Sequence, residues 1–206
     1  WILLTLGSAF VYENTGDGKQ EVVANCHKVP ADKFNRRLLK TEEVSAVLQE
    51  MIKKVKSVNP DSNFIFTISP VRHLREGFIE NNRSKAALIQ AVHSLTNNED
   101  VFYFPAYELV IDDLRDYRFY AEDMVHPNYA ATNYVWEKFI PACIDESSQQ
   151  LMKEIAVIMA ARNHKPFNPA SEQHAKFLAN NAERIERLIQ QYQHLDFKEE
   201  LNYFRK

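Results

Sequence analysis

Three apolar runs, separated by two amphipathic helix patterns, constrain this chain to one class of fold. The runs cover Trp1–Gly7, Asn63–Pro70 and Val101–Tyr107, and each is continuous enough to form a buried strand. A helix pattern begins at Thr41 between the first two runs, and a second covers Ser84–Leu95 between the last two. Strand, helix, strand, helix, strand predicts an α/β fold, in which right-handed crossovers place helices on both faces of a parallel sheet.

The helix predicted from Thr41 has a start signal and a continuous apolar face. Thr41 is the expected N-cap, because its hydroxyl can accept a free N–H of the first turn, where two acids follow. The apolar side chains recur at helical spacing and form one face: Val44, Val47, Leu48, Met51, Ile52 and Val55. We expect that face to cover the sheet.

A polar turn after the first run predicts a hairpin. Gly16 and Gly18 lie between Phe10–Glu13 and Glu21–Ala24, two short segments of strand-forming residues. The chain has four glycines in all, and this lone Gly-x-Gly sits in a polar turn. A glycine-rich phosphate-binding loop is therefore excluded.

The chain begins inside its first strand. The run from Trp1 is apolar from its first residue and follows no polar leader. We therefore expect an upstream segment that includes a first strand, and the function is expected to depend on residues in that segment.

Composition limits the classes of protein. The 206 residues are 45% hydrophobic and 26% charged, which is typical of a globular protein with one sizeable core, and no run is long enough to span a membrane. The formal charge of −3 argues against nucleic acid as a partner, because phosphate binding requires a basic excess. Cys26 and Cys143, far apart in sequence, predict free thiols in a reducing compartment and hence a cytoplasmic location.

Polar residues gather where the predicted strands end. Gly7 and Ser8 follow the first run, and Arg72 and His73 follow the second. In parallel sheets, ligands bind outside the carboxyl ends of the strands. We therefore expect Arg72 or His73 to contact a substrate, with hydrogen bonding to nearby loops as the alternative.

The third strand leads to a carboxylate–histidine pair. Asp123 stands three residues before His126, and a helix pattern starts at Tyr129. On one tight turn the carboxylate can fix the imidazole tautomer, which leaves the second ring nitrogen as the base for a hydroxyl nucleophile. The alternative is an Asp at the start of a helix with a nearby surface His. The charged residues before this pair are expected to form a supporting, salt-bridged turn: Asp112, Asp113, Arg115, Asp116 and Arg118.

The composition changes in the last third of the chain. Ser147–Asn163 and Ser171–Tyr192 are helix patterns rich in charged residues and Gln, and Asp196–Phe204 predicts a short third helix. We expect a main domain over residues 1–144 and a helical extension over residues 145–206. The charged faces of the extension are expected to be solvated, and a surface for a second copy or another partner is the alternative.

Four blocks of this sequence resemble, in order, the bacterial GSCFA-domain proteins over roughly residues 1–140. The blocks are Leu3–Tyr12 (LLTLGSAFVY), Ala24–Pro30 (ANCHKVP), Thr67–Gly77 (TISPVRHLREG) with Glu80–Ala86 (ENNRSKA), and Tyr103–Tyr107 (YFPAY) through His126 and Pro127. That family is similar to a branch of the SGNH (GDSL-like) hydrolases. The resemblance implies a three-layer α/β/α parallel sheet of SGNH type, with its first strand missing from this chain.

The resemblance also implies an activity, which is hydrolysis or transfer of an acyl ester, with an acetyl group on a carbohydrate as the candidate substrate and no cofactor. The Asp-x-x-His-Pro pattern of the superfamily is matched by Asp123–Pro127, which implies catalytic roles for His126 and Asp123. The Gly-Ser-Cys-Phe-Ala motif that names the family, and whose Ser would be the nucleophile, is expected upstream of Trp1. The Gly-x-Asn-Asp pattern is matched at Leu6–Ala9, without its Asn.

Because the Asn of that pattern is missing, the hydrogen-bond donors of the oxyanion hole are not assigned. The backbone N–H of Gly7 or Ser8 could replace the missing donor, as could Asn25 from the next loop, where His27 is a further candidate for a substrate contact. Ser8 and Ser69 are alternative nucleophiles. However, Ser69 precedes a proline, and neither serine has a nucleophile-elbow sequence.

Other functions have less support. Asn25, Cys26 and His27 suggest a metal, but no further Cys or His lies at ligand spacing, so we expect no metal. A thiol nucleophile at Cys26 would need the fold to bring it to His126. A noncatalytic binding or scaffold protein is the second hypothesis, and the presence of the serine motif upstream would discriminate between the two. The expected partner is a small-molecule or carbohydrate acyl ester, and neither nucleic acid nor a membrane.

Overall fold

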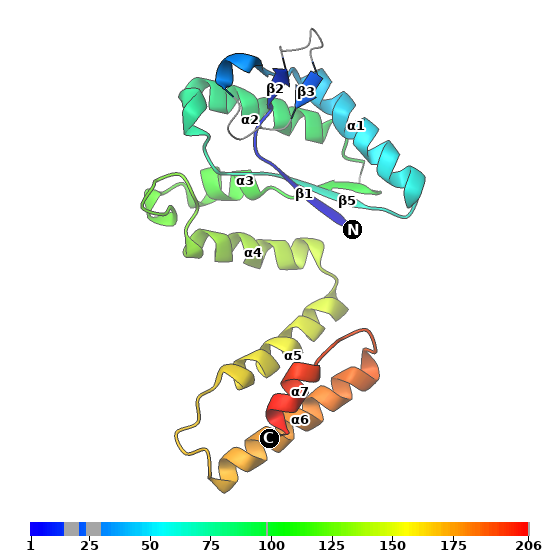
Figure 1. The fold of residues 1–206 in the computed structure, drawn as a ribbon, viewed down its shortest axis with the longest axis vertical. Coiled ribbons are helices and arrows are strands. Elements are labelled where there is room, and N and C mark those ends of the chain that lie inside the picture. Colours follow the sequence, from blue (N-terminus) through cyan, green and yellow to red (C-terminus); the bar gives the residue numbers. More distant parts are fainter. Residues whose placement is uncertain (15–20, 24–29, 98, 206) are drawn as a thin grey trace. The chain divides into compact units, whose positions relative to one another are not determined.

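The chain folds into two compact units, Trp1–Ala142 and Cys143–Lys206. The computed structural model describes residues 1–14, 21–23, 30–97 and 99–205, and Figure 1 shows the elements of both units. None of the helices in these ranges combines the length and the apolarity that a membrane crossing requires.

A parallel sheet forms the centre of the first unit, as predicted. Its strands are β1 (Ile2–Leu6), β5 (Phe64–Ile68) and β6 (Val101–Tyr103), in the order β1-β5-β6. All five residues of the central strand β5 are buried, which explains its unbroken apolar sequence. The third strand ends at Tyr103 and not at Tyr107 as predicted. Pro105 has no N–H for the ladder, and the chain turns there into α3 (Ala106–Glu108).

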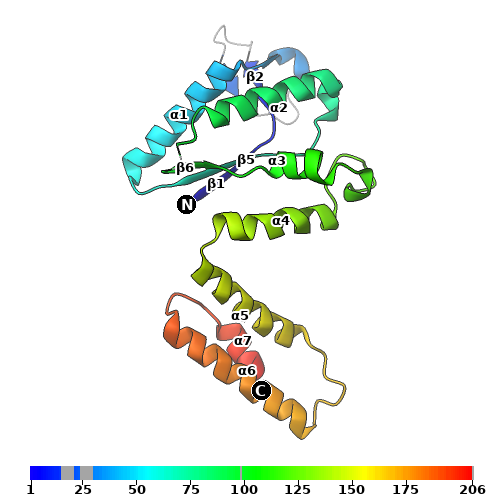
Figure 2. The ribbon, with the colours of Figure 1, turned by 180° about the vertical axis from the view of Figure 1, so that it is seen from behind.

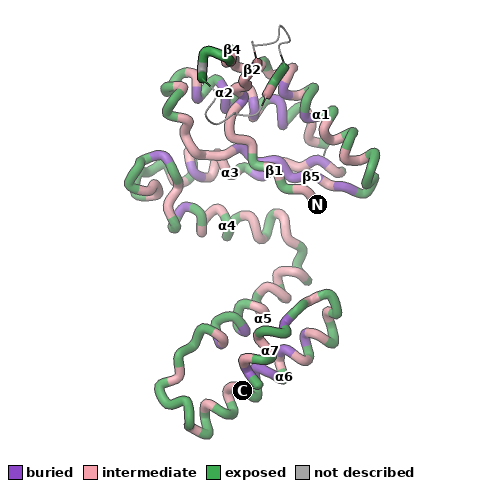
Figure 3. The backbone as a smooth tube through the Cα atoms, viewed as in Figure 1, coloured by how far each residue is buried: buried purple, intermediate pink, exposed green. Residues whose placement is uncertain are grey.

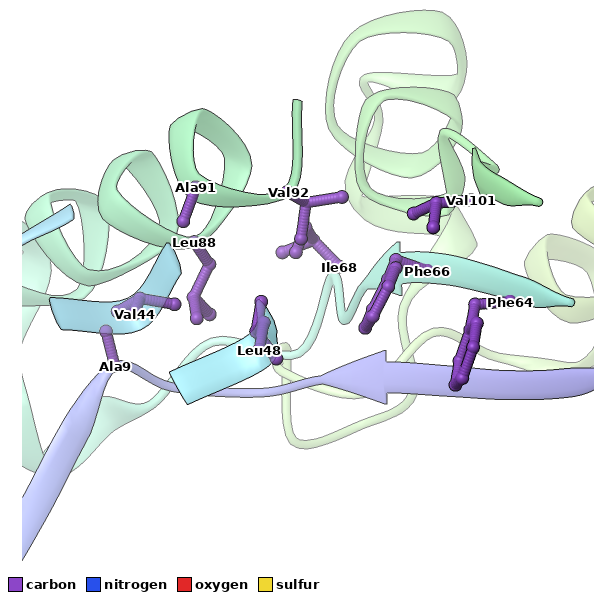
Figure 4. Packing of buried hydrophobic residues seen from close by; sticks show 10 residues of the cluster. All are labelled: Ala9, Val44, Leu48, Phe64, Phe66, Ile68, Leu88, Ala91, Val92 and Val101. Carbon is purple, nitrogen blue, oxygen red and sulfur yellow. The ribbon is translucent and has the colours of Figure 1, made fainter. Parts of the chain in front are cut away.

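Helices α1 (Thr41–Val58) and α2 (Gly77–His93) pack together on one side of this sheet (Figures 1 and 2). The buried residues between the helices and the sheet form the core of the unit (Figure 4): Ala9, Val44, Leu48, Phe64, Phe66, Ile68, Leu88, Ala91, Val92 and Val101. Removing this apolar surface from water is the main force that holds the layers together. The predicted apolar face of α1 is confirmed except at Val47, which lies at the edge of the stripe and is 59% exposed.

Both helices begin differently from the prediction. The N-cap of α1 is Lys40 and not Thr41. The Glu43 carboxylate accepts the Lys40 N–H at 2.9 Å, so a side chain from the first turn provides a hydrogen-bond acceptor at the N-terminus of the helix. Helix α2 begins at Gly77 and not at Ser84, because a glycine with a φ of 72° lets the chain turn into the helix there. Polar residues interrupt the apolar pattern in the first turns of α2, so the sequence did not predict a helix there. These residues form hydrogen bonds with the segments that follow β1 and β5.

A second, antiparallel sheet joins β2 (Phe10–Asn14), β3 (Glu21–Val23) and β4 (Phe34–Leu38) in the order β3-β2-β4. The predicted hairpin of β2 and β3 is confirmed, and its connecting residues, with Gly16 and Gly18, lie outside the described residues. Strand β4 was not predicted, because its sequence is polar. Its arginines reach carboxylates elsewhere in the unit: Arg37 to Glu13 at 2.7 Å, and Arg36 to Glu76.

Helix α4 (Tyr129–Cys143) lies on the other side of the parallel sheet from α1 and α2 in both views (Figures 1 and 2). Its Phe139 packs edge-on against Phe104, with the ring centres 5.0 Å apart. This side is covered incompletely, since Leu3 of β1 is 53% exposed. One-turn helices complete the unit: Ala31–Lys33, Leu74–Glu76, Leu109–Leu114 and Tyr117–Phe119.

The second unit contains α5 (Glu146–Asn163), α6 (Glu172–Gln191) and α7 (Lys198–Phe204), as the helix patterns predicted. Asp145 and Ser171 are the N-caps of α5 and α6. The unit has its own apolar core, formed by Ile158, Ala161, Ala182, Ile185, Leu188, Phe197 and Phe204. Figure 3 shows how burial varies along each helix.

Candidate functional site

The carboxyl ends of β1 and β5 carry the polar residues that the sequence places there. Gly7 and Ser8 follow β1, and Ser69 begins the segment after β5. The Ser69 N–H donates to the Leu6 carbonyl oxygen at 2.9 Å, so the two segments leave the sheet side by side.

A buried lysine holds these two strand ends together. Lys85 of α2 is 1% exposed, and its Nζ donates to the carbonyl oxygens of Gly7 and Ser69, each at 2.6 Å. Burial lowers the Lys85 pKa to about 8, because the ammonium loses its water. The two carbonyl oxygens replace part of that water, and in turn they are held in place by a single side chain.

Two further polar residues of α2 bind the same loops. The Ser84 Oγ accepts the Ala9 N–H at 2.7 Å, and the Asn81 Oδ1 accepts the His73 N–H at 3.0 Å. With Lys85 they follow i, i+3, i+4 spacing, so one face of α2 presents all three. None of the three was predicted as a site residue, although a polar interruption of an apolar helix face is a visible signal.

Lys85→Met should lower the free energy of unfolding of the first unit by about 2 kcal/mol at neutral pH, because two carbonyl groups lose their donor while only part of the desolvation cost of the ammonium is recovered. The folded pKa of about 8 lies below the ordinary 10.5, so the unfolded chain binds more protons between these values. The Lys85 protein therefore gains stability as the pH rises through this interval, and the methionine variant does not.

Urea unfolding across that pH interval measures the difference between the two proteins. Lys53→Met, at an exposed lysine of α1, is the matched control and should change stability by less than about 0.5 kcal/mol. A stability difference that shrinks as the pH rises would contradict this account of Lys85.

Gly7 and His73, predicted separately, lie against each other. A Cβ at position 7 would stand 3.4 Å from the His73 Nε2, which is at the short end of ordinary van der Waals contact. The Gly7 carbonyl is held by Lys85, and in a trans peptide the following N–H, that of Ser8, points the opposite way. In the part of the chain that the structure describes, this N–H has no hydrogen-bond partner.

The predicted hydrogen bond between Asp123 and His126 is present. The Asp123 Oδ2 lies 2.6 Å from the His126 Nδ1, and its Oδ1 accepts the N–H groups of His126 at 3.0 Å and Val125 at 2.9 Å. Met124 between them adopts a φ of 59°, which closes the turn. The His126 N–H, the His126 ring and the Val125 N–H together lower the Asp123 pKa to about 2, so the carboxylate is ionised near neutral pH.

The second ring nitrogen of His126 lies on an exposed side chain. The side chain is 62% exposed, and among the described residues its Nε2 has no hydrogen-bond partner. With the Nδ1 proton donated to Asp123, Nε2 is the basic nitrogen. Asn128 anchors the turn, since its Nδ2 donates to the Arg118 carbonyl at 2.7 Å and its Oδ1 accepts the Ala131 N–H at 3.2 Å in the first turn of α4.

A cavity of about 190 Å³ is lined by Arg72, Ile111, Arg115, Asp116, Tyr117 and Tyr120. Tyr120 pairs with Pro127 in an antiparallel bridge, which connects the cavity wall to the turn of Asp123 and His126. Arg72 belongs to the segment after β5, so this cavity lies between the second and third strand-end segments.

The predicted salt-bridged turn is present in part. Arg115 contacts Asp112 at 3.2 Å, and Arg118 contacts Asp116 at 3.5 Å. Asp113 departs from the prediction, because its carboxylate accepts the Tyr134 hydroxyl of α4.

The structure does not join all the predicted residues. The Asp123–His126 pair does not line the cavity of Arg72, and across the described ranges no hydrogen bond connects it to the Gly7 and Ser8 segment. The Ser69 Oγ accepts the Val71 N–H at 3.2 Å, a local turn without a histidine.

Three predicted residues lie outside the described residues: Asn25, His27 and Cys26. Cys143 is a free cysteine, and burial raises the pKa of its thiol. Within the described ranges, no three side chains of His, Cys, Asp or Glu are grouped so that they could hold a metal ion.

These features define an α/β protein with a carboxylate–histidine turn and a strand-end cluster fixed by a buried lysine. The chain belongs to the GSCFA family, whose model matches residues 1–139. The model of the GSCFA domain protein, C-terminal domain, matches residues 155–206. No curated protein and no solved structure matches the chain.

Proposed function

We propose that this protein hydrolyses or transfers an acyl ester by a serine–histidine–aspartate mechanism of SGNH type. The observation that carries the proposal is the 2.6 Å contact between the Asp123 Oδ2 and the His126 Nδ1, with the other side of the imidazole exposed. An aspartate in this position fixes the tautomer of the base and stabilises the imidazolium that forms. The Asp-x-x-His-Pro spacing, which resembles that of SGNH hydrolases, supports the same assignment.

In the proposed reaction, a serine hydroxyl attacks the ester carbonyl while the His126 Nε2 takes its proton. Collapse of the tetrahedral intermediate breaks the bond to the alcohol, which receives that proton, and leaves an acyl-serine. A water molecule or an acceptor hydroxyl then attacks the acyl-serine and gives its proton to Nε2, from which the serine recovers it. Asp123 stays ionised throughout, because its hydrogen bonds hold its pKa at about 2.

The Ser8 N–H is the proposed donor to the oxyanion. Its orientation is fixed through the Gly7 carbonyl by Lys85, and a donor that is already oriented stabilises developing charge without a reorganisation cost. The proposed nucleophile is the serine of the family's Gly-Ser-Cys-Phe-Ala motif, in a segment upstream of Trp1. An acetylated carbohydrate is the candidate substrate by resemblance, and the fold alone does not specify it.

The test compares this chain with the extended chain, defined as the same protein lengthened upstream to include the serine motif. With p-nitrophenyl acetate and then acetylated sugars, we expect hydrolysis above background only in the extended chain, since a base without its nucleophile retains little rate enhancement. If the 206-residue chain is equally active, its nucleophile lies within it and the assignment of roles is wrong. If neither protein hydrolyses an ester, the noncatalytic binding or scaffold hypothesis replaces the enzyme.

A further inference from the structure

Arg72 is a half-buried cation in the wall of a cavity. It lines the 190 Å³ cavity, and within the described residues no Asp or Glu forms an ion pair with it. Its guanidinium lies 5.9 Å from the centre of the Phe78 ring. The nearby Arg115 and Arg118 differ, because each contacts an aspartate of its own turn. A cation partly removed from water and left unpaired is poised to bind an anion.

Tyr120 lines the same cavity as Arg72. Burial raises the pKa of Tyr120, and the charge of Arg72 acts on it in the opposite direction. In the part of the chain that the structure describes, the Tyr120 hydroxyl has no hydrogen-bond partner, so the cavity wall carries two kinds of donor, a guanidinium and a phenol.

We propose that Arg72, with the hydroxyl of Tyr120, binds a carboxylate or phosphate group of the substrate. The guanidinium offers parallel N–H donors that match two oxygens of either group, and a phenolic hydroxyl can donate to the same oxygens. The inference rests on the proposed function in one respect only, namely that the molecule bound is the ester substrate.

The other charges in the cavity wall leave Arg72 available. The Asp116 Oδ1 accepts the Arg118 N–H at 2.9 Å and its Oδ2 contacts the Arg118 guanidinium at 3.5 Å, so this carboxylate is already bound on both oxygens. Arg115 adds a second positive charge, shared with Asp112. A volume of about 190 Å³ suits a charged group or a single sugar ring and is too small for a macromolecular segment.

The cavity wall is connected along the chain to both parts of the proposed active site. Arg72 is followed directly by His73, whose ring lies against Gly7. Tyr120 pairs with Pro127, the residue after His126. On the proposed function, an anionic group bound here belongs to the ester substrate. The substrate class is an acyl ester of an acidic compound, such as an acetylated sugar acid or sugar phosphate, in preference to a neutral ester.

The test titrates the 206-residue chain with inorganic phosphate and with acetate, and with sodium chloride and glucose as controls, at constant ionic strength. NMR follows the ring signals of Tyr120 and the Nε–H of Arg72. We expect saturable shifts with phosphate and acetate only. Arg72→Gln should weaken binding about tenfold or more, and Arg72→Lys should weaken it less, because lysine keeps the charge and loses the paired donors.

Arg75→Gln is the matched control, since it removes the same charge from an exposed arginine three residues away, and it should change binding less than about twofold. Equal weakening by Arg75→Gln, identical shifts with chloride, or shifts that never saturate would each overturn the proposal. If circular dichroism shows that Arg72→Gln does not fold, Tyr120→Phe replaces it, with an expected weakening of about threefold, and unchanged binding would overturn the proposal.

These titrations need no turnover, so their failure is distinct from failure of the proposed function. In the extended chain, Arg72→Gln should lower the ratio of kcat/KM for an acidic acetyl ester to kcat/KM for p-nitrophenyl acetate about tenfold. Equal effects on the acidic and the neutral ester would contradict an anion subsite while leaving the esterase itself in place.

Discussion

His126→Ala in the extended chain should lower kcat for ester hydrolysis by about 10⁵-fold or more, with little change in KM. In the proposed mechanism the His126 Nε2 takes the serine proton and returns it to the leaving alcohol, so its loss slows both half-reactions. The side chain is 62% exposed and contributes little packing, so the variant should fold as the parent does.

The decisive measurement is the rate of p-nitrophenyl acetate hydrolysis with and without added imidazole. Because His126 is exposed, free imidazole can reach the same position and should restore part of the lost rate. His194→Ala removes an exposed imidazole from the second unit and should leave kcat unchanged. A His126→Ala protein that keeps more than about a tenth of the parental kcat would remove His126 from the role of base.

The parts of the fold that were predictable are those whose pattern is local. The unbroken apolar sequence of β5 and the helical spacing of α1 are each visible within one segment. Strand β4 was missed because its arginines bind carboxylates that come from other elements, which no local pattern reveals. The end of β6 was misplaced because the apolar run continues past Pro105, although the ladder cannot.

The same distinction applies to the candidate site. Asp123 and His126 were found because they are three residues apart on one turn, so their spacing sets their contact. Lys85 was not found, because its role depends on two carbonyl groups that the fold brings to it from β1 and β5. The cavity is also non-local, since Arg72 meets residues of the segment 111–120 only in the folded unit. Arg72 was predicted as a strand-end residue and Tyr117 as part of the core or the site wall, but no role was predicted for Tyr120.

Asp123→Asn in the extended chain should lower kcat about 10⁴-fold while the turn persists. The asparagine Oδ1 can still accept the N–H groups of Val125 and His126, which hold the turn in place. Its amide nitrogen, however, is a donor, and facing the His126 Nδ1 it favours the tautomer that carries the proton on Nε2. A protonated Nε2 cannot accept the proton of a serine hydroxyl, so the base is present in the wrong form.

This exchange of tautomers can be measured in the 206-residue chain itself, without turnover. The ¹⁵N chemical shifts of the His126 ring should place the proton on Nδ1 in the parent and on Nε2 in the Asp123→Asn variant.

The stability of the folded turn at acid pH is a second test of the contact between Asp123 and His126. The folded Asp123 pKa of about 2 lies below the ordinary 3.8, so the carboxylate stabilises the folded turn above pH 3.8 and loses that effect as the pH falls towards 2. The asparagine variant should lack this acid transition. Glu122→Gln, at an exposed carboxylate on the same turn, is the matched control and should keep the parental tautomer, acid transition and kcat. A parental tautomer in the Asp123→Asn protein would show that Asp123 does not orient the imidazole, and the role of the carboxylate in the proposed mechanism would then have to be abandoned.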